Sequence, residues 1–314
     1  MTAKTNKDSK KESYNFKRSP FYKCRSIKYL CKILKISKND LDNILNKKEE
    51  QFNEFKRNRP LCDKKYEEFK CFKNSLLIKS IRYDTTKNKE RTMIYPKKNS
   101  EYKKLNRRIF NLLSRIINIK PEYNSMRKKK NCNKNFSHLD YVKTHLSNKY
   151  YTLTMDISNF YPSITEETMY NFFKKDMKCC NRVAKILAKL TTVKTNENDE
   201  ASLPQGFCFS PVLSWLVCRK QFNKIYNYCQ QNNIIFTNWI DDIAFSCKDE
   251  EKLKQVKGLT KNELYKIDLE IKEEKTKFFS KNHKEIMNII INKGIATTSK
   301  NKNYKRMVKN INKH

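Results

Sequence analysis

The stretch that decides the fold is a short apolar run with two adjacent acids near its centre, Ile234-Ile235-Phe236-Thr237-Asn238-Trp239-Ile240-Asp241-Asp242-Ile243-Ala244-Phe245-Ser246. Its flanks are rich in strand formers, so the run predicts two β-strands joined by a tight turn at Asp241 and Asp242. Two carboxylates on an apolar hairpin are costly unless a positive charge lies beside them, and Mg²⁺ readily takes carboxylate oxygens. The alternative interpretation is an ordinary hairpin with an Asp-Asp turn. A third acid elsewhere would decide between the two.

The chain is strongly basic along its whole length. Its 314 residues include 69 Lys and Arg against 33 Asp and Glu, which gives a formal net charge of +36. A protein with this charge repels itself unless it meets a polyanion, and nucleic acid is the commonest one. The length is sufficient for two or three packed subdomains. Composition alone therefore predicts a nucleic-acid-binding protein.

Several classes of site are excluded by what the sequence lacks. The 11 cysteines are scattered without a CxxC pair, and only four histidines are present. This predicts reduced thiols in a cytoplasmic protein, with neither a disulfide framework nor a zinc site. No run of 18 apolar residues and no apolar leader is found, so we expect no membrane partner. With three glycines and no GxGxxG or P-loop motif, a nucleotide would have to be held by metal and by Lys or Arg.

The first half of the chain is predicted to contain an arm, a helical block and a hairpin. Residues 1–20 lack periodicity and are expected to form a basic flexible arm, followed by a helical N-terminal extension at 21–75. A β-hairpin is expected over 76–96, with Lys87, Lys89 and Arg91 at the start of its return strand. A helix over 101–118 follows.

The second half predicts the partner for the two aspartates. A strand should end at Asp156, and an aromatic turn should lead to a helix over 166–192. The further expected elements are a turn at 203–206, a helix at 210–230, the acidic hairpin, a helix at 249–267, and a strand pair near 269–279 and 286–291. A βαββ order would bring Asp156 beside Asp241 and Asp242. Three such carboxylates suit two Mg²⁺ ions that catalyse in-line nucleotidyl transfer.

The chain resembles bacterial reverse transcriptases, most closely the retron and retron-like antiviral-defence group. The resemblance is carried by six segments in the family's order: Lys87–Pro96 (fingers), Asp156–Ile164 (motif A), Leu203–Gly206 with Ser210–Ser214 (B), Trp239–Asp242 (C), Glu273–Thr276 (D) and Ile286–Gly294 (E). It implies an α+β right-hand polymerase fold with fingers at 76–149 and a palm at 150–291. The residues at 292–314 would be a short basic remnant of an abbreviated thumb.

The resemblance also implies a function and its partners. The chain is expected to be an RNA-directed DNA polymerase that makes cDNA from dNTPs on a structured non-coding RNA, in phage defence. Its cofactor would be two Mg²⁺ ions, with Mn²⁺ as an alternative. The RNA template and primer and the DNA product would be its partners. An effector protein, or a protein that supplies the thumb, is a further candidate.

Each predicted site residue takes its role from its place in the family's motifs. The resemblance implies that Asp156 and Asp241 bind metal and that Asp242 completes the catalytic cluster. The remaining expectations concern the nucleotide: Tyr161 as the steric gate under the sugar, Gln205 lining the pocket, Arg91 with Lys87 or Lys89 clamping the triphosphate, and Lys275 (with Lys277 as its rival) donating a proton to pyrophosphate.

The chain departs from the family pattern at several points. Trp239 stands where motif C has Tyr, the retron Asn-Ala-x-x-His pattern keeps only His145, and Ile286–Asn288 replaces Val-Thr-Gly. Two alternative functions therefore stay open. One is a non-retron defence reverse transcriptase that makes protein-primed or untemplated DNA. The other is a catalytically weak RNA-binding subunit that keeps the palm as a scaffold.

Overall fold

The computed structural model describes residues 14–57, 76–84, 89–117, 138–194, 200–287 and 289–297. It contains helices together with mostly antiparallel sheets, which confirms the α+β class. By contacts the chain forms two compact units. The first unit is Met1–Asn118 with Thr165–Val212, and the second unit is Ile119–Ile164 with Leu213–His314. Residues of the segment 150–291 contribute to both units.

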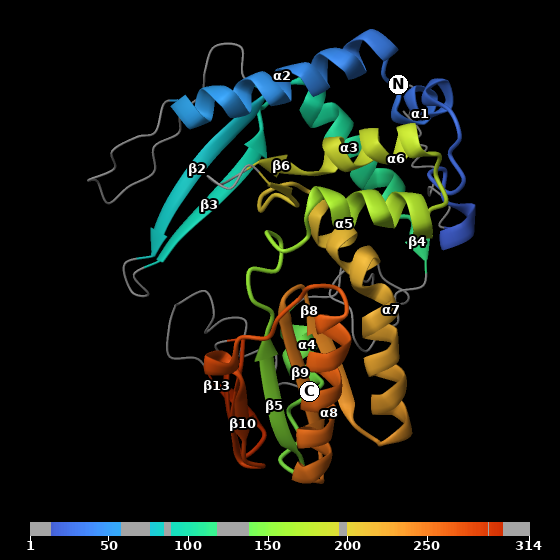
Figure 1. Cartoon of the computed structure of the whole chain (residues 1–314). Coiled ribbons are helices and arrows are strands. Elements are labelled where there is room, and N and C mark those ends of the chain that lie inside the picture. Colours follow the sequence, from blue (N-terminus) through green and yellow to red (C-terminus); the bar gives the residue numbers. More distant parts are fainter. Residues whose placement is uncertain are drawn as a thin grey trace, which may run out of the picture. The chain divides into compact units, whose positions relative to one another are not determined.

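The second unit is built on a four-stranded antiparallel sheet in the order β10-β5-β9-β8 (Figure 1). Side chains alternate between its two faces, and the rings of Phe236 and Phe245 stack 5.0 Å apart on one of them. Helix α8 packs against β5 and β9. The bounds of these elements are β5 (Tyr151–Asp156), β8 (Ile235–Trp239), β9 (Asp242–Cys247), β10 (Lys277–Phe279), α7 (Ser210–Gln231) and α8 (Glu250–Tyr265).

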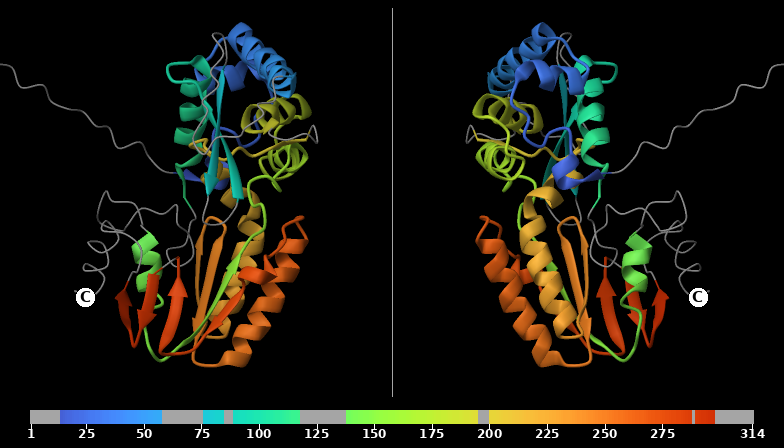
Figure 2. Two further views of the ribbon diagram at one scale, coloured as in Figure 1. Left: turned by 90° about the vertical axis from the view of Figure 1, so that its left-hand side faces the viewer. Right: turned by 90° about the vertical axis from the view of Figure 1, so that its right-hand side faces the viewer.

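A short helix and a small sheet complete the second unit. Helix α4 (His138–Lys143) lies beside a sheet of β11 (His283–Ile286), β12 (Ile289–Asn292) and β13 (Ile295–Thr297), as Figure 2 shows. Both contribute to one buried cluster, and Trp239 packs against it. The buried members of this cluster are Tyr141, Val142, Ala244, Ile286, Ile289, Ile291 and Ala296. The end of β8 thus packs against a cluster to which both α4 and the small sheet contribute.

The first unit combines helices with a long β-hairpin. Serine or threonine caps begin four of its helices, as Ser26, Ser37, Ser100 and Thr165 each accept a backbone N–H of the first turn. Its helices are α1 (Ile27–Leu34), α2 (Lys38–Arg57), α3 (Glu101–Leu113), α5 (Glu166–Asn171) and α6 (Asn181–Thr191). Its strands are the hairpin β2 (Leu77–Asp84) and β3 (Lys89–Pro96), the pair β6 (Val193–Lys194) and β7 (Ala201–Ser202), and the parallel pair β1 (Tyr14–Asn15) and β4 (Ile116–Ile117).

Most predicted elements are found, but three expectations differ from the structure. The helix expected over 166–192 is interrupted: α5 continues as a π-helical turn, η2 (Phe172–Asp176), and Lys178 has a positive φ of 54°. Strand β10 pairs with β5, while β11 pairs with β12, so 269–279 and 286–291 are not one strand pair. Residues 14–20 do not behave as an arm, because the Tyr14 hydroxyl bonds to the Leu112 carbonyl and 16–18 form a 3₁₀ turn.

The remaining expectations reach beyond the described residues. The tail at 298–314, the arm at 1–13 and the part of the helical block at 58–75 lie there. Among the helices that the structure describes, none is long and apolar enough to cross a bilayer.

Candidate active site

The acidic hairpin closes through a strained two-residue turn. Trp239 pairs with Asp242, which leaves Ile240 and Asp241 as the two turn residues. Ile240 has a φ of 61°, a region that β-branched residues avoid, at a cost of about 1–3 kcal/mol. The buried side-chain amide of Asn238 donates a hydrogen bond to the Ile240 carbonyl at 3.0 Å. The sequence did not single out Asn238, which holds this turn in place.

The strand register brings the third acid to the same place. Asp156, the last residue of β5, is the direct cross-strand partner of Asp242 on β9. Beyond the strand, the Ile157 amide donates to the Asp241 carbonyl at 3.0 Å. Cross-strand partners have their side chains on the same face of a sheet, roughly 5 Å apart at Cβ. The carboxylates of Asp156 and Asp242 therefore share one end of one face, with Asp241 at the turn beside them.

Burial and the neighbouring negative charges raise the pKa values of the hairpin acids. Partial burial, reinforced by the charges of Asp241 and Asp156, raises the pKa of Asp242 to about 7. Burial also raises the pKa of Asp241, with a smaller contribution from Asp156. Lys272 and Lys275 act in the opposite direction on both groups. The site thus favours any added positive charge.

Two lysines contact Asp156 from the segment that follows α8. Lys272 Nζ lies 2.7 Å from one carboxylate oxygen of Asp156, and Lys275 Nζ lies 3.2 Å from the other. The backbone fixes this segment, because the Lys272 amide donates to the Asp156 carbonyl at 2.9 Å. Lys275 is thus at the acids, whereas its rival Lys277 lies on β10, 4.0 Å from Glu285. Sequence reasoning missed Lys272, since only the tertiary pairing brings it to Asp156.

The three aspartates suit a hard divalent cation by their chemistry. They offer carboxylate oxygens on a partly buried, electronegative site, and these are the ligands that Mg²⁺ prefers. Within the described residues, however, no three Asp, Glu, His or Cys side chains converge as a ready metal cage. Both oxygens of Asp156 contact lysine ammonium groups instead. A metal ion would thus share the Asp156 carboxylate with these two lysines.

Tyr161 lies in the turn that follows Asp156 and Ile157. Its ring packs against Phe160 at 5.7 Å, and the turn is tightened at Asn159, whose φ is 40°. Burial raises the pKa of the Tyr161 hydroxyl, and the charge of Asp241 adds to this effect. Tyr161 is therefore within electrostatic range of the acidic hairpin, and its predicted role as a steric gate stays a prediction.

The first unit brings two other predicted segments together. The Ile94 amide of β3 donates to the Gln205 carbonyl at 2.9 Å. Gly206 follows with a φ of 121°, and a Cβ at this position would lie 2.5 Å from the Ile94 carbonyl oxygen. Only glycine fits there, so the turn at 203–206 docks on the strand that carries Arg91. The side chains of Lys89 and Arg91, and all of Lys87, lie outside the described residues.

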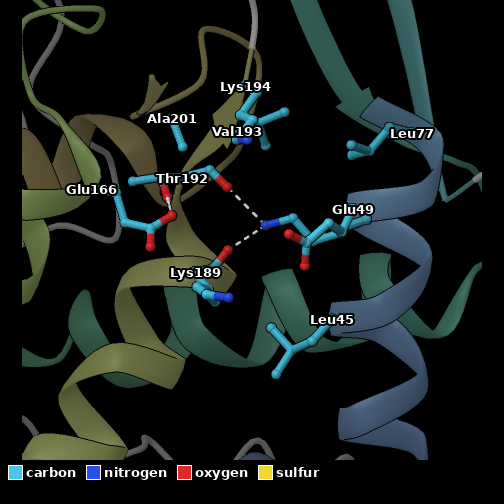
Figure 3. A pocket seen from close by; sticks show the side chains of 10 residues that line it. Leu45, Glu49, Leu77, Glu166, Lys189, Thr192, Val193, Lys194 and Ala201 are labelled. Atoms are coloured by element: carbon cyan, nitrogen blue, oxygen red, sulfur yellow. Dashed lines mark hydrogen bonds between the residues drawn. The ribbon is translucent and has the colours of Figure 1, made fainter. Parts of the chain in front are cut away.

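The first unit also contains a pocket of about 260 Å³ (Figure 3). Lys48 of α2 donates to the carbonyls of Lys189 and Thr192, which are exposed where α6 ends. The Tyr102 hydroxyl donates to the neighbouring Leu190 carbonyl at 2.8 Å. These bonds satisfy carbonyls that a helix end leaves unpaired, so they attach α2 and α3 to α6. None of the three aspartates lines this pocket.

Comparison with known proteins agrees with the predicted resemblance. The profile of the family described as "Reverse transcriptase (RNA-dependent DNA polymerase)" matches residues 84–304. The Retron Se72 reverse transcriptase of Salmonella heidelberg (strain 579083-10) is 29% identical over 64% of this chain and 50% of its own length. The Retron Ec86 reverse transcriptase of Escherichia coli is 27% identical over 33% of this chain and 30% of its own. The chain thus spans half or less of the length of these relatives.

One solved structure that aligns with this chain is apo telomerase from Candida Tropicalis, truncated from its C-terminal domain. The alignment covers 68% of this chain and 53% of the telomerase chain. The two are 16% identical, with a TM-score of 0.45.

Proposed function

Because the chain belongs to the reverse transcriptase family, we propose that it is an RNA-directed DNA polymerase that extends a primer by metal-dependent nucleotidyl transfer. One observation carries the proposal: Asp156 and Asp242 are cross-strand partners, with Asp241 in the adjoining turn. The raised pKa values of the hairpin acids support it, since like charges that converge on one point favour a cation. An ordinary Asp-Asp turn would not have a third acid opposite it.

The proposed mechanism assigns most of the work to positioning and charge. Asp156, Asp241 and Asp242 would hold two Mg²⁺ ions, with Mn²⁺ as an alternative. When bound, the metal lowers the pKa of the primer hydroxyl and neutralises the leaving pyrophosphate. The sheet holds the aspartates in register before substrate arrives, so little reorganisation is needed. Lys275, already at the acids, would donate a proton to pyrophosphate.

The other predicted roles rest on the family resemblance. Tyr161 would exclude the 2′-hydroxyl of a ribonucleotide, and Gln205 would line the nucleotide pocket. Arg91, with Lys87 or Lys89, would clamp the triphosphate. The net charge of +36 supports a nucleic-acid partner. Similarity to retron reverse transcriptases favours a structured non-coding RNA as template and primer, in a cytoplasmic phage-defence system.

Primer extension on an RNA template with Asp241→Asn tests the proposal. This change removes one charge and keeps the shape, and we expect DNA synthesis to fall by roughly a thousandfold or more while RNA binding survives. Asp249→Asn is the matched control, because Asp249 caps α8 and asparagine caps equally well. Normal synthesis by Asp241→Asn would overturn the assignment.

One observation favours a second candidate, a catalytically weak RNA-binding subunit. Lys272 and Lys275 together contact both oxygens of Asp156. RNA binding without any DNA product from the unaltered protein, in Mg²⁺ or Mn²⁺, would select this function. The non-retron alternative is separated by the product, since DNA bonded to a tyrosine would favour protein priming, and DNA branched from an RNA 2′-hydroxyl would favour a retron.

A further inference from the structure

Helix α4 contacts the acidic hairpin through one buried tyrosine. The Tyr141 hydroxyl lies 3.2 Å from the backbone carbonyl of Asp242 and 3.4 Å from that of Thr237. A tyrosine has one proton to donate, so the two carbonyls share it, and the nearer is that of Asp242. Tyr141 is only 1% exposed, so water does not compete for this contact.

The Tyr141 ring makes a second contact with the hairpin. It meets Trp239 in an edge-to-face arrangement, with ring centroids 6.5 Å apart and an interplanar angle of 80°. Trp239 directly precedes the strained turn at Ile240 and pairs with Asp242. Trp239 stands where motif C has Tyr, and Tyr141 stands where the retron Asn-Ala-x-x-His pattern has Asn. The structure places these two rings against each other. Tyr141 thus touches the hairpin on both sides of the turn.

A buried histidine extends these contacts across the sheet. His145 follows α4 and is fully buried, with Nε2 2.7 Å from Thr237 Oγ1 on β8 and Nδ1 2.8 Å from Ser246 Oγ on β9. Ser246 in turn lies 2.7 Å from Thr152 Oγ1 on β5. The result is one chain of hydrogen bonds that joins β8, β9 and β5 through a single imidazole.

This polar chain shares a face with the catalytic acids. Thr152 pairs with Ser246 just as Asp156 pairs with Asp242, and these positions are separated by even numbers of residues along each strand. Because side chains alternate between the two faces along each strand, those of Thr152, Asp156, Asp242 and Ser246 lie on one face of the sheet. At one end of this face stand the acids, and at the other stands His145.

We infer that Tyr141 is a positioning residue for the acidic hairpin, with His145 as its second anchor. The inference rests on the proposed function. A strained turn persists only when its surroundings over-determine it, and Tyr141 binds the backbone of Asp242, the first residue after that turn. Without this contact, the hairpin can relax and carry Asp241 and Asp242 away from Asp156. The cost then falls on metal binding and turnover, since Tyr141 acts on the acids through the backbone of Asp242.

The test compares Tyr141→Phe with Tyr102→Phe in the full chain. Both residues are buried tyrosines whose hydroxyls donate to backbone carbonyls, but Tyr102 bonds to Leu190 at the end of α6 in the first unit. Each change keeps the ring and removes one hydroxyl. Both should lower the melting temperature by a similar amount.

Only Tyr141→Phe should change metal use. We expect its half-saturating Mg²⁺ concentration in primer extension to rise about fivefold, the effect of one hydrogen bond on an equilibrium. The turnover number should fall with it, while KM for dNTP stays constant. Mn²⁺ binding to the nucleic-acid-free protein, followed by electron paramagnetic resonance, should weaken to the same degree. The Tyr102→Phe protein should match the unaltered protein in all three measurements.

His145→Gln gives an independent second variant, because glutamine keeps one donor and one acceptor but has a different reach. It should shift Mn²⁺ affinity in the same direction as Tyr141→Phe. Equal Mn²⁺ binding by Tyr141→Phe, Tyr102→Phe and the unaltered protein would overturn the inference. Mn²⁺ binding requires no catalysis, so this comparison holds even if the protein makes no DNA, the result that would refute the proposed function.

Discussion

The two compact units bury polar side chains in opposite ways. In the first unit, Lys48 and Tyr102 each bond to backbone carbonyls at the end of α6, so every charge or hydroxyl involved has a partner of complementary character. In the second unit, the acids of the hairpin lie against each other and against Asp156. The first arrangement satisfies helix ends, whereas the second accumulates like charge that Lys272 and Lys275 offset only in part and that favours an added cation.

This contrast shows what a shifted pKa does and does not indicate. Burial lowers the pKa of Lys48 to about 7 in the first unit and that of Lys284 to about 8 in the second. Both lysines bond to pairs of backbone carbonyls, so both are structural. Burial is also the largest cause of the raised pKa of Asp242, about 7, but there the charges of Asp241 and Asp156 raise it further. Convergence of like charges therefore distinguishes the functional site, whereas the size of a shift does not.

Replacing Gly206 by alanine tests whether the first unit contributes to the chemistry. The added Cβ would meet the Ile94 carbonyl at 2.5 Å, on a backbone whose φ of 121° disfavours alanine. We expect the turn at 203–206 to move off β3, at a cost of about 2–4 kcal/mol in the free energy of unfolding. If Gln205 lines the nucleotide pocket, kcat/KM for dNTP should fall roughly tenfold or more, by analogy with other misplaced groups.

The control for this change is Gly258→Ala in α8 of the second unit. A Cβ at Gly258 meets nothing within 4 Å, and alanine is the better helix former. Gly258→Ala should stabilise the protein by up to about 1 kcal/mol and leave primer extension unchanged. An unchanged kcat/KM in the folded Gly206→Ala protein would show that this turn has no part in nucleotide binding.

Lys48→Met should lower the stability of the protein without changing its activity. The change removes the ammonium group that caps the carbonyls of Lys189 and Thr192, and methionine fills much of the same space. We expect a loss of about 1–2 kcal/mol in the free energy of unfolding, measured by urea denaturation. DNA synthesis per folded molecule should not change. Lys47→Met on the exposed side of α2 is the control, and a loss of synthesis in Lys48→Met alone would give the pocket in Figure 3 a role in the reaction.

The sequence predicted those features of the site that depend on local pattern. Strand-forming residues around Asp241 and the strand that ends at Asp156 were enough to predict that the acids meet, because a βαββ order makes those strands neighbours. The contacts of Lys272, Asn238 and Tyr141 could not be predicted in this way. The contacts of Lys272 and Tyr141 depend on which segment packs against the hairpin, and nothing in the periodicity of 138–145 or 269–276 fixes that packing. The bond of Asn238 lies within the hairpin and depends on the geometry of its turn. The positive φ of Ile240 could not be predicted either, because isoleucine is normally a strand residue.

A pH dependence of stability in the second unit should come from His145. Burial, together with the charge of Lys284 on β11, lowers the pKa of His145 to about 3. In the unfolded chain the same imidazole binds a proton below about pH 6.5. Between these two pH values the folded state thus binds fewer protons than the unfolded state. The free energy of unfolding therefore rises with pH across this window and falls on acidification.

His145→Gln should flatten this slope. Between pH 6.5 and 5, the unaltered protein should lose about 2 kcal/mol of stability through His145, and the variant should lose none by this route. Melting temperatures over the same range would measure the difference, with His283→Gln as the control because His283 is exposed. An equal slope in His145→Gln and the unaltered protein would mean that the imidazole accepts a proton in place. In that case the hydrogen-bond chain from Thr237 to Thr152 would have to rearrange at low pH, because both ring nitrogens of a protonated histidine are donors.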